Sequence, residues 1–286
     1  MQTLENDFLK IVSSAQGAEL KSVFSKHTNL EYMWQAGREW QKHAPVLFPI
    51  VGQLKGDTFY YNNKPFNLPR HGFARDSDFV ISNQSQNHIQ YLLQQNTATE
   101  NFPFSFNFFV SYTLFDSKVE TKFEIENTGN KEMYFSVGGH PAFRVPLYDS
   151  ENYDDYYLEF DKQENASRYL LQDGLLSGQK EYVLCNTNVL WLSKSLFYKD
   201  ALVFKDLQSE RISIKSKASS NGLHFNFNGF DSFGIWAAKD ADFVCLEPWM
   251  GHTDWLNHNQ NIVDKEGIIR LSSECKFCCN YFIEPF

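Results

Sequence analysis

The sequence predicts an all-β protein that folds as one large, mostly antiparallel β-sandwich with few short helices. Apolar and polar residues alternate in many segments, turn-forming residues separate these segments, and hardly any stretch has a helical period. The chain of 286 residues contains 27 Phe and 14 Tyr, which is ample material for a large core. We expect a single domain over residues 1–286, because no linker or charge block divides the sequence.

The alternation is clearest in residues 104–114, where even positions are apolar and odd positions are mainly polar. Residues 119–126 repeat the pattern with charged residues on the other face, as in a half-buried antiparallel strand. With a third strand over residues 133–138, these segments predict a meander. Further strands are expected at 9–13, 19–25, 30–34, 88–94, 157–160, 190–192, 201–204, 211–216, 223–228, 232–237 and 242–246, and short helices at 35–43 and 164–171.

Composition excludes several classes of protein. The net charge of −9 argues against a nucleic-acid partner, because nucleic-acid binders usually carry a basic face. No apolar run approaches the roughly 20 residues of a membrane helix, and the first residues show no signal-peptide pattern. Cys275, Cys278 and Cys279 lack a second ligand pair, so we expect reduced thiols on a terminal strand. These features indicate a cytoplasmic protein that does not bind a membrane.

Three short segments interrupt the alternation and gather Gly, Pro, His and carboxylate residues. The first contains Arg70, His71 and Arg75, which suit the binding of hydroxyls or of an anionic group. The same residues are equally consistent with a basic surface loop that pairs with Asp76 and Asp78. This segment alone leaves both interpretations open.

The second segment places His140 between two glycines and a proline. Gly138 and Gly139 allow a ligand or another backbone to approach closely at the end of a strand. Pro141 restricts the backbone of His140 to an extended form, which fixes the direction of its imidazole. Isolated histidines usually have structural roles, but this context favours a functional site at His140.

The third segment places Glu247 at the end of an apolar strand. A carboxylate is costly there unless it is paired or used, and burial raises its pKa towards the range of a general base. Pro248 restrains the backbone, and Trp249 offers a flat apolar face for a sugar ring. A salt bridge to an arginine is the alternative explanation for Glu247.

In this order, the three segments resemble the aldose 1-epimerase superfamily, and its LacX-like branch in particular. The matching residues are His-Gly-Phe-Ala-Arg at 71–75, Gly-His-Pro-Ala-Phe at 139–143 and Glu-Pro-Trp-x-Gly-x-x-Asp at 247–254. The likeness extends along nearly the whole chain and includes residues 47–52 and 200–204. The hexose-6-phosphate epimerases are more distant relatives.

The resemblance implies a galactose-mutarotase-like β-supersandwich that interconverts the α and β anomers of a hexose without a metal or other cofactor. It assigns His140 as the general acid, Glu247 as the base and His71 as a contact of the sugar. Arg75 is similar to an arginine near the substrate in the phosphorylated-sugar branch. Many relatives have a sugar-contacting arginine where this chain has Gln53, so the resemblance leaves the identity of the sugar open.

Three alternatives to a free-hexose epimerase follow from the residues. Arg70 and Arg75 favour an enzyme of the same fold that acts on a sugar phosphate, because guanidinium groups make bidentate contacts with phosphate. Gln53 favours a carbohydrate-binding or sensing protein without turnover. A metal-dependent β-sandwich enzyme is the third and weakest alternative, with three candidate ligands: His71, His140 and His252.

Aromatic residues in the three segments are candidate walls of a sugar pocket: Phe73, Phe143 and Trp249. The remaining histidines are expected to have structural roles: His27, His43, His88, His224 and His258. The expected partner is a small-molecule hexose, either free or phosphorylated, and the expected assembly is a monomer or homodimer.

Overall fold

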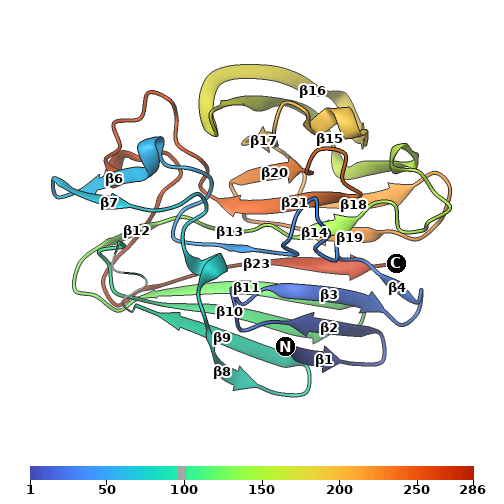
Figure 1. Cartoon of the computed structure of the whole chain (residues 1–286), viewed down its shortest axis with the longest axis horizontal. Coiled ribbons are helices and arrows are strands. Elements are labelled where there is room, and N and C mark those ends of the chain that lie inside the picture. The colour runs from blue at the N-terminus through green and yellow to red at the C-terminus, as the bar shows by residue number, and fades with distance from the viewer. Residues whose placement is uncertain (96–98, 100) are drawn as a thin grey trace.

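The computed structural model describes residues 1–95, 99 and 101–286 of the chain (Figure 1). Strands dominate these residues, and the described helices are short 3₁₀ segments rather than α-helices. They are η1 (Lys55–Asp57), η2 (Ala74–Asp76), η4 (Tyr153–Asp155), η5 (Lys194–Phe197) and η6 (Ile262–Asp264). None of the described helices is long and apolar enough to cross a membrane. The prediction of an all-β fold with few short helices is confirmed.

Most strands belong to one antiparallel sheet, which has 15 strands in the described part of the chain. Its main path runs β5 (Val46–Leu47), β13 (Val137–Gly139), β21 (Phe243–Met250), β20 (Ser232–Trp236), β17 (Leu202–Phe204), β15 (Tyr156–Gln172), β18 (Arg211–Ser216), β19 (Leu223–Asn226), β23 (Lys276–Pro285), β11 (Lys118–Asn127), β10 (Phe106–Phe115), β9 (His88–Gln94) and β8 (Val80–Gln84). Off this path, β14 (Ala142–Arg144) pairs with β21, and β16 (Leu175–Trp191) pairs with β15.

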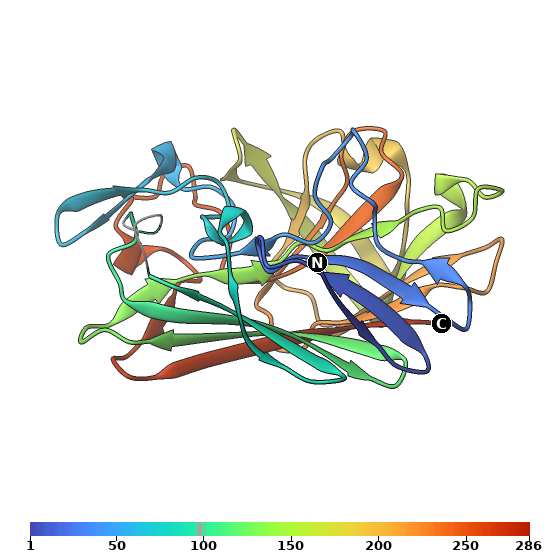
Figure 2. The ribbon, with the colours of Figure 1, turned by 60° about the horizontal axis from the view of Figure 1, so that its bottom comes forward.

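A second sheet covers part of the large one and consists of β1 (Gln2–Glu5), β2 (Leu9–Ser13), β3 (Leu20–Ser25) and β4 (Leu30–Glu31). Figures 1 and 2 together show it as a separate layer beside β9 to β11. Hydrogen bonds join the layers: Ser13 Oγ lies 2.7 Å from the Tyr91 hydroxyl, and the Tyr112 hydroxyl donates to the Ala18 carbonyl at 2.6 Å. Two small sheets pair β6 (Thr58–Tyr61) with β7 (Lys64–Asn67), and β12 (Met133–Phe135) with β22 (Ile269–Leu271).

Alternating side chains fill the space inside the layers. Phe106 and Phe108 of β10 and Phe123 of β11 are buried. The residues that alternate with them along each strand are mostly more exposed and more polar. The ring of Phe48, which follows β5, lies 4.5 Å from the ring of Phe108. Buried side chains of both layers belong to one contiguous apolar cluster. The alternation of apolar and polar residues in the sequence therefore reflects one buried face on each strand.

The predicted meander is only partly present. β10 and β11 form the expected hairpin, but residues 133–138 divide between β12, which pairs with β22, and β13, which pairs with β5 and β21. The break falls at Ser136, whose N–H donates to the Pro49 carbonyl at 2.7 Å. The second neighbour of β11 is instead the C-terminal strand β23. That strand contains Cys278 and Cys279, so the predicted terminal strand is confirmed, and the described cysteines form no disulfide.

Both predicted short helices are wrong. Residues 35–43 form an irregular loop, in which the Trp34 indole N–H donates to the Trp40 carbonyl at 2.8 Å. Residues 164–171 belong to β15, where buried Glu164 accepts backbone N–H groups from the segment before β18. The loop also has a distant contact, because the His43 N–H donates to the Glu19 carboxylate at 2.7 Å, so in both places distant parts of the chain help to decide the backbone conformation.

β15 and β16 form a hairpin that is much longer than the strands predicted at 157–160 and 190–192. Each strand has 17 residues, with several shifts of register between them, and the hairpin arches over the upper end of the molecule in Figure 1. Asp173 and Gly174 form its turn, with φ of 53° and 79°, and we call these two residues the hairpin tip. Gly174 reaches the cavity described below.

We predict that Phe143→Ala lowers the free energy of unfolding by about 3–5 kcal/mol. The side chain is 0% exposed, and its ring packs 5.8 Å from that of Phe225. Urea unfolding followed by tryptophan fluorescence measures the change. Phe115→Ala is the matched control: this phenylalanine is 51% exposed, so its loss should cost less than about 1 kcal/mol. Equal losses in the two variants would contradict the core position of Phe143.

Candidate active site

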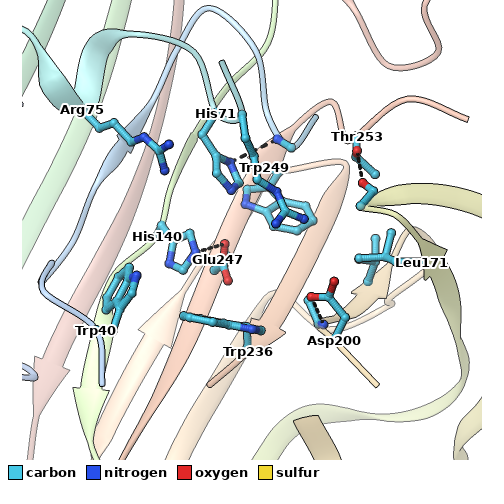
Figure 3. Close-up of a pocket in the computed structure, with 15 residues that line it drawn as sticks. Trp40, His71, Arg75, His140, Leu171, Asp200, Trp236, Glu247, Trp249 and Thr253 are labelled. Carbon is cyan, nitrogen blue, oxygen red and sulfur yellow. Dashed lines mark hydrogen bonds and ion pairs between the residues drawn. The ribbon is translucent and has the colours of Figure 1, made fainter. Parts of the chain in front are cut away.

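A cavity of about 290 Å³ opens between the large sheet and several loops (Figure 3). Val203 of β17, Trp236 of β20 and Glu247 and Trp249 of β21 line its floor. The loops and the hairpin tip provide the walls. All three segments that the sequence singled out, including residues 70–75, therefore meet at a single cavity.

The sequence suggested that Glu247 lies at the end of a strand. In the structure, Glu247 lies within β21 instead. β21 continues through Pro248 and Trp249 to Met250 and is buried along nearly its whole length. β20 pairs with residues 245–249 on one side, whereas on the other side β14 and β13 pair only with its two ends. Pro248, which has no N–H, falls in the gap between β14 and β13. Because side chains alternate along a strand, Glu247 and Trp249 both face the cavity.

His140 and Pro141 fill the gap between β13 and β14. The Pro141 carbonyl accepts the Leu246 N–H at 3.2 Å, and the His140 N–H donates to the Pro45 carbonyl at 3.0 Å. These bonds direct the imidazole towards β21, where His140 Nε2 lies 3.2 Å from Glu247 Oε2 (Figure 3). The structure thus brings the two predicted catalytic residues into direct contact at the floor of the cavity.

Two glycines allow β13 to approach β21 this closely. A Cβ at Gly138 would lie 2.8 Å from both the Pro248 carbonyl oxygen and the Trp249 ring, and a Cβ at Gly139 would lie 2.8 Å from the Tyr281 ring. The space that the sequence reserved for a ligand or another backbone is therefore taken up by the protein itself.

Aromatic rings enclose the imidazole of His140. Trp40 stacks on it at 5.1 Å between centroids, and Trp236 and His71 contact it edge-on at 5.6 Å and 5.7 Å. His140 is 8% exposed, and its Nδ1 has no hydrogen-bond partner among the described residues. The imidazole is therefore largely shielded from water but remains accessible from the cavity.

This environment shifts the pKa of both partners. Burial, reinforced by the positive charges of Arg75 and Arg70, lowers the pKa of His140 to about 3. Burial raises the pKa of Glu247 well above its usual range, and the charge of Arg70 opposes the rise. Burial therefore favours the uncharged form of each group, a neutral imidazole beside a protonated carboxyl, with one proton between His140 Nε2 and Glu247 Oε2.

The orientation of His71 follows from a reciprocal contact with Gly52. The His71 N–H donates to the Gly52 carbonyl at 2.7 Å, and the Gly52 N–H donates to His71 Nδ1 at 3.1 Å. Because Nδ1 is an acceptor, the proton of the neutral ring lies on Nε2. Burial, followed by the charges of His140 and Arg75, holds the pKa of His71 well below its usual value. His71 is therefore a neutral hydrogen-bond donor at the cavity.

Arg70 and Arg75 both line the cavity, Arg70 as an exposed residue and Arg75 as a half-buried one. Arg75 Nε lies 3.4 Å from the Asp76 carboxylate, which also binds Lys42 at 2.7 Å. The surface-pairing interpretation of this segment thus holds for Asp76, yet the Arg75 guanidinium extends towards the cavity in Figure 3. Together the two arginines make this side of the cavity positive.

Three residues predicted to bind the sugar do not line the cavity. The Gln53 amide donates to the Asp57 carboxylate at 3.2 Å. Phe73 packs against core rings such as Phe48, at 6.0 Å, and Phe143 lies fully within the core. These two phenylalanines lie within the motifs but hold the motif segments against the core, whereas Trp249 does line the cavity.

Sequence analysis assigned no role to Trp40, Asp200, Trp236 and Thr253, which all line the cavity. Asp200 lies two residues before the start of β17 and across the cavity from Arg75 in Figure 3. Trp236 is the last residue of β20. A polar or aromatic residue at a strand end was the only available signal for these two, and Trp40 lay within a segment predicted to be helical.

One group of three possible metal ligands occurs in the described part of the chain: His140, Cys245 and Glu247, with ligand atoms within 4.8 Å of one another. His252 is not part of this group and does not line the cavity, so the predicted set of three histidines is not assembled. Burial raises the pKa of the Cys245 thiol well above its usual value, which disfavours the thiolate that a metal requires. The chemistry of this group favours proton transfer over metal coordination.

Comparisons with known proteins identify the family of the chain. A family model described as aldose 1-epimerase matches residues 1–267. "Protein LacX, chromosomal" from Lactococcus lactis subsp. lactis is 33% identical over 280 residues, which are 94% of this chain and 93% of that protein. The similarity therefore extends over the fold and all three motif segments.

Solved structures show the same architecture. A galactose mutarotase related enzyme from Lactobacillus acidophilus has a TM-score of 0.95 and 34% identity, covering 100% of this chain and 97% of that chain. A galactose mutarotase-like protein from Lactobacillus casei ATCC 334 has a TM-score of 0.94 and 28% identity, covering 100% of both chains. The predicted galactose-mutarotase-like fold is confirmed, and the chain belongs to the aldose 1-epimerase family.

Proposed function

We propose that the chain is an aldose 1-epimerase that interconverts the α and β anomers of a hexose, with His140 as acid and Glu247 as base. The observation that carries this proposal is the 3.2 Å contact between His140 Nε2 and Glu247 Oε2 at the floor of a cavity lined by tryptophans. The family assignment supports a sugar substrate, as does the description of a similar L. acidophilus protein as a galactose mutarotase related enzyme.

Ring opening requires two proton transfers, one at each of the two oxygens bonded to C1. Glu247 takes the proton of the C1 hydroxyl, the bond between C1 and the ring oxygen breaks as the aldehyde forms, and the ring oxygen takes a proton from His140. Both oxygens are bonded to C1, so an acid and a base that lie side by side can reach them together. After rotation about the C1–C2 bond, the two transfers reverse and the ring closes on the other face.

The shared proton of the pair fits this cycle. With the proton on His140, the pair is an imidazolium and a carboxylate, which is the form that begins ring opening. With the proton on Glu247, the pair is neutral, which is the form that burial favours in the empty cavity. The two forms contain the same number of protons, so a bound sugar can select the reactive form without exchange with solvent.

The cavity suits one monosaccharide. Its volume of about 290 Å³ lies near the lower end of ligand cavities, about 300–1,000 Å³. Trp236 and Trp249 offer flat apolar faces to the C–H groups of a sugar ring. His71, Arg70 and Asp200 offer donors and acceptors to its hydroxyls. Gln53 stands where many relatives have an arginine, and in this chain the cationic side chains at the cavity are Arg70 and Arg75.

Glu247→Gln should lower kcat for mutarotation by about 10²–10⁴-fold, because an amide cannot accept the proton of the C1 hydroxyl. Polarimetry on freshly dissolved α-glucose and α-galactose, corrected for the spontaneous rate, measures the change, and circular dichroism checks the fold. Glu5→Gln on β1 is a control that should retain the wild-type rate. Full activity of Glu247→Gln would remove Glu247 from the role of base. Sugar binding by the wild-type protein without rate acceleration would instead favour a carbohydrate-binding or sensing protein.

The rate should follow a bell-shaped pH profile set by the His140–Glu247 pair. A second proton would give the pair a net positive charge, which burial and the nearby Arg70 and Arg75 oppose. The acid limb should therefore lie well below the ordinary imidazole pKa of about 6.5, and catalysis should persist at about pH 5. Removal of the shared proton ends activity on the alkaline side. Initial rates across pH, corrected for buffer catalysis, test this, and an acid limb centred near pH 6.5, the ordinary imidazole value, would contradict it.

A sugar phosphate is the second candidate substrate, and the presence of two arginines at the cavity favours it. Guanidinium groups bind phosphate through paired, charge-assisted hydrogen bonds. Arg75 has one carboxylate contact, with Asp76, and its guanidinium extends towards the cavity in Figure 3. This side of the cavity could therefore hold an anionic substituent of the sugar.

If a phosphate is recognised, glucose 6-phosphate should have a KM at least about tenfold below that of glucose, and the gap should narrow at high salt because charges are screened. Arg75→Gln and Arg70→Gln should abolish the preference while leaving the KM of glucose much less affected. Competition by inorganic phosphate provides an independent check. Equal KM values for the two sugars at low salt would leave the free hexose as the substrate.

A further inference from the structure

A buried ion pair that proton transfer does not use lies behind the wall of the cavity. Asp254, the last residue of the third motif, is 2% exposed, and Lys265 is 4% exposed. Lys265 Nζ lies 2.6 Å from Asp254 Oδ1 and donates to the His252 carbonyl at 2.6 Å. Asp254 Oδ2 accepts the Lys55 N–H at 2.9 Å. The carboxylate therefore joins the segment at Lys55 to both ends of the loop from His252 to Lys265.

The energetics of such a pair point to orientation. Removing two charges from water is expensive, and replacing a buried ion pair by apolar residues is often neutral or stabilising, so the pair is weak evidence for stability alone. What a buried pair does provide is a fixed arrangement of the groups around it. Here those groups are backbone segments at the cavity.

The backbone on both sides of Asp254 holds the wall together. The Asp254 N–H donates to the Gln53 carbonyl at 2.9 Å, and the Asp254 carbonyl accepts the Leu176 N–H at 2.9 Å. The Thr253 hydroxyl accepts the Gln53 N–H at 3.0 Å and donates to the Gly174 carbonyl at 2.6 Å (Figure 3). The ion pair thus fixes the loop that connects the Gly52–Gln53 segment with the hairpin tip.

Three residues of this connected wall line the cavity: Gly52, Gly174 and Thr253. Gly52 also binds Nδ1 of His71 and so fixes the direction of that ring. The space beside Gly174 is tight, since a Cβ there would lie 2.5 Å from Gln53 Oε1 and 3.1 Å from Arg70 Nη2. A small movement of the loop would therefore displace both His71 and the neighbours of Arg70.

We infer that Asp254, held by Lys265, is a positioning residue that sets the sugar-facing wall formed by Thr253, Gly174 and Gly52, and through it the affinity for the sugar. The inference rests on the proposed sugar-binding function. The sheet fixes Glu247 and His140 through contacts outside the loop that carries Thr253 and Asp254. The wall and the acid–base pair are therefore positioned by separate contacts.

Asp254→Asn tests this inference, because it keeps the shape of the side chain but leaves the Lys265 ammonium unpaired. We expect the KM for the preferred sugar to rise on the order of tenfold, since small displacements of binding groups have large effects, while kcat stays within about twofold. Glu164→Gln is the matched control. Glu164 is a buried carboxylate, 1% exposed, that also accepts backbone N–H groups, but it lies outside the cavity. The Glu164→Gln variant should have a lower melting temperature and an unchanged KM.

Thr253→Val provides a second variant that leaves the ion pair intact but releases Gly174. It should raise KM by a similar factor, and the double variant should be no worse than either single one, because both act through the same wall. An unchanged KM in Asp254→Asn, with a melting-temperature loss like that of Glu164→Gln, would overturn the inference. If Asp254→Asn does not fold, an unchanged KM in Thr253→Val overturns it.

Sugar binding measured by calorimetry separates this inference from the proposed catalysis. If the wild-type protein binds sugar without accelerating mutarotation, the proposed catalysis fails, and the inference is judged by the same comparison of variants on Kd. If no sugar among free and phosphorylated hexoses binds to the wild-type protein, both proposals fail.

Discussion

A carboxylate in the middle of a fully buried strand is the constraint on which the site depends. Glu247 is 2% exposed, and an unpaired charge there would be strongly unfavourable. The neighbouring strands compensate: β14 and β13 pair only with the ends of β21, and His140 enters the gap between them and contacts Glu247. The irregularity of the sheet at this point is what allows His140 to contact Glu247. Gly138 and Pro248 tolerate the irregularity, since one has no Cβ and the other has no N–H.

The sequence predicted those strands whose pattern depends on one buried face alone. Residues 9–13 and 211–216 agree with the bounds of β2 and β18. Residues 164–171 were assigned to a helix because the inner face of β15 carries Glu164 and Arg168, which interrupt the apolar alternation. Glu164 binds N–H groups near residue 208, and Arg168 binds a glutamate of β16. A single-sequence pattern cannot reveal such partners, so polar residues on a buried face hide the strand.

The same distinction applies to the site. Glu247 and His140 could be identified because their conformational requirements are local: prolines and glycines beside them mark an unusual backbone. Trp40 and Asp200 gave no such signal, since each becomes part of the cavity only when its loop reaches the sheet from another region of the chain. Conversely, Phe73 has the residue type of a pocket wall but belongs to the core. Residue type identifies chemical capability, whereas long-range packing decides which residues share a cavity.

The proposed proton transfer and the proposed sugar binding depend on different parts of this architecture. The pairing of strands fixes His140 beside Glu247, while Arg70, Asp200 and the hairpin tip belong to loops and turns, which can vary with less effect on the fold. Gln53 illustrates the consequence. Its amide turns to Asp57, and the positive charge at the cavity comes from neighbouring loop residues instead. Under the proposed function, changes in these loops would therefore alter which sugar binds without moving Glu247 or the imidazole beside it.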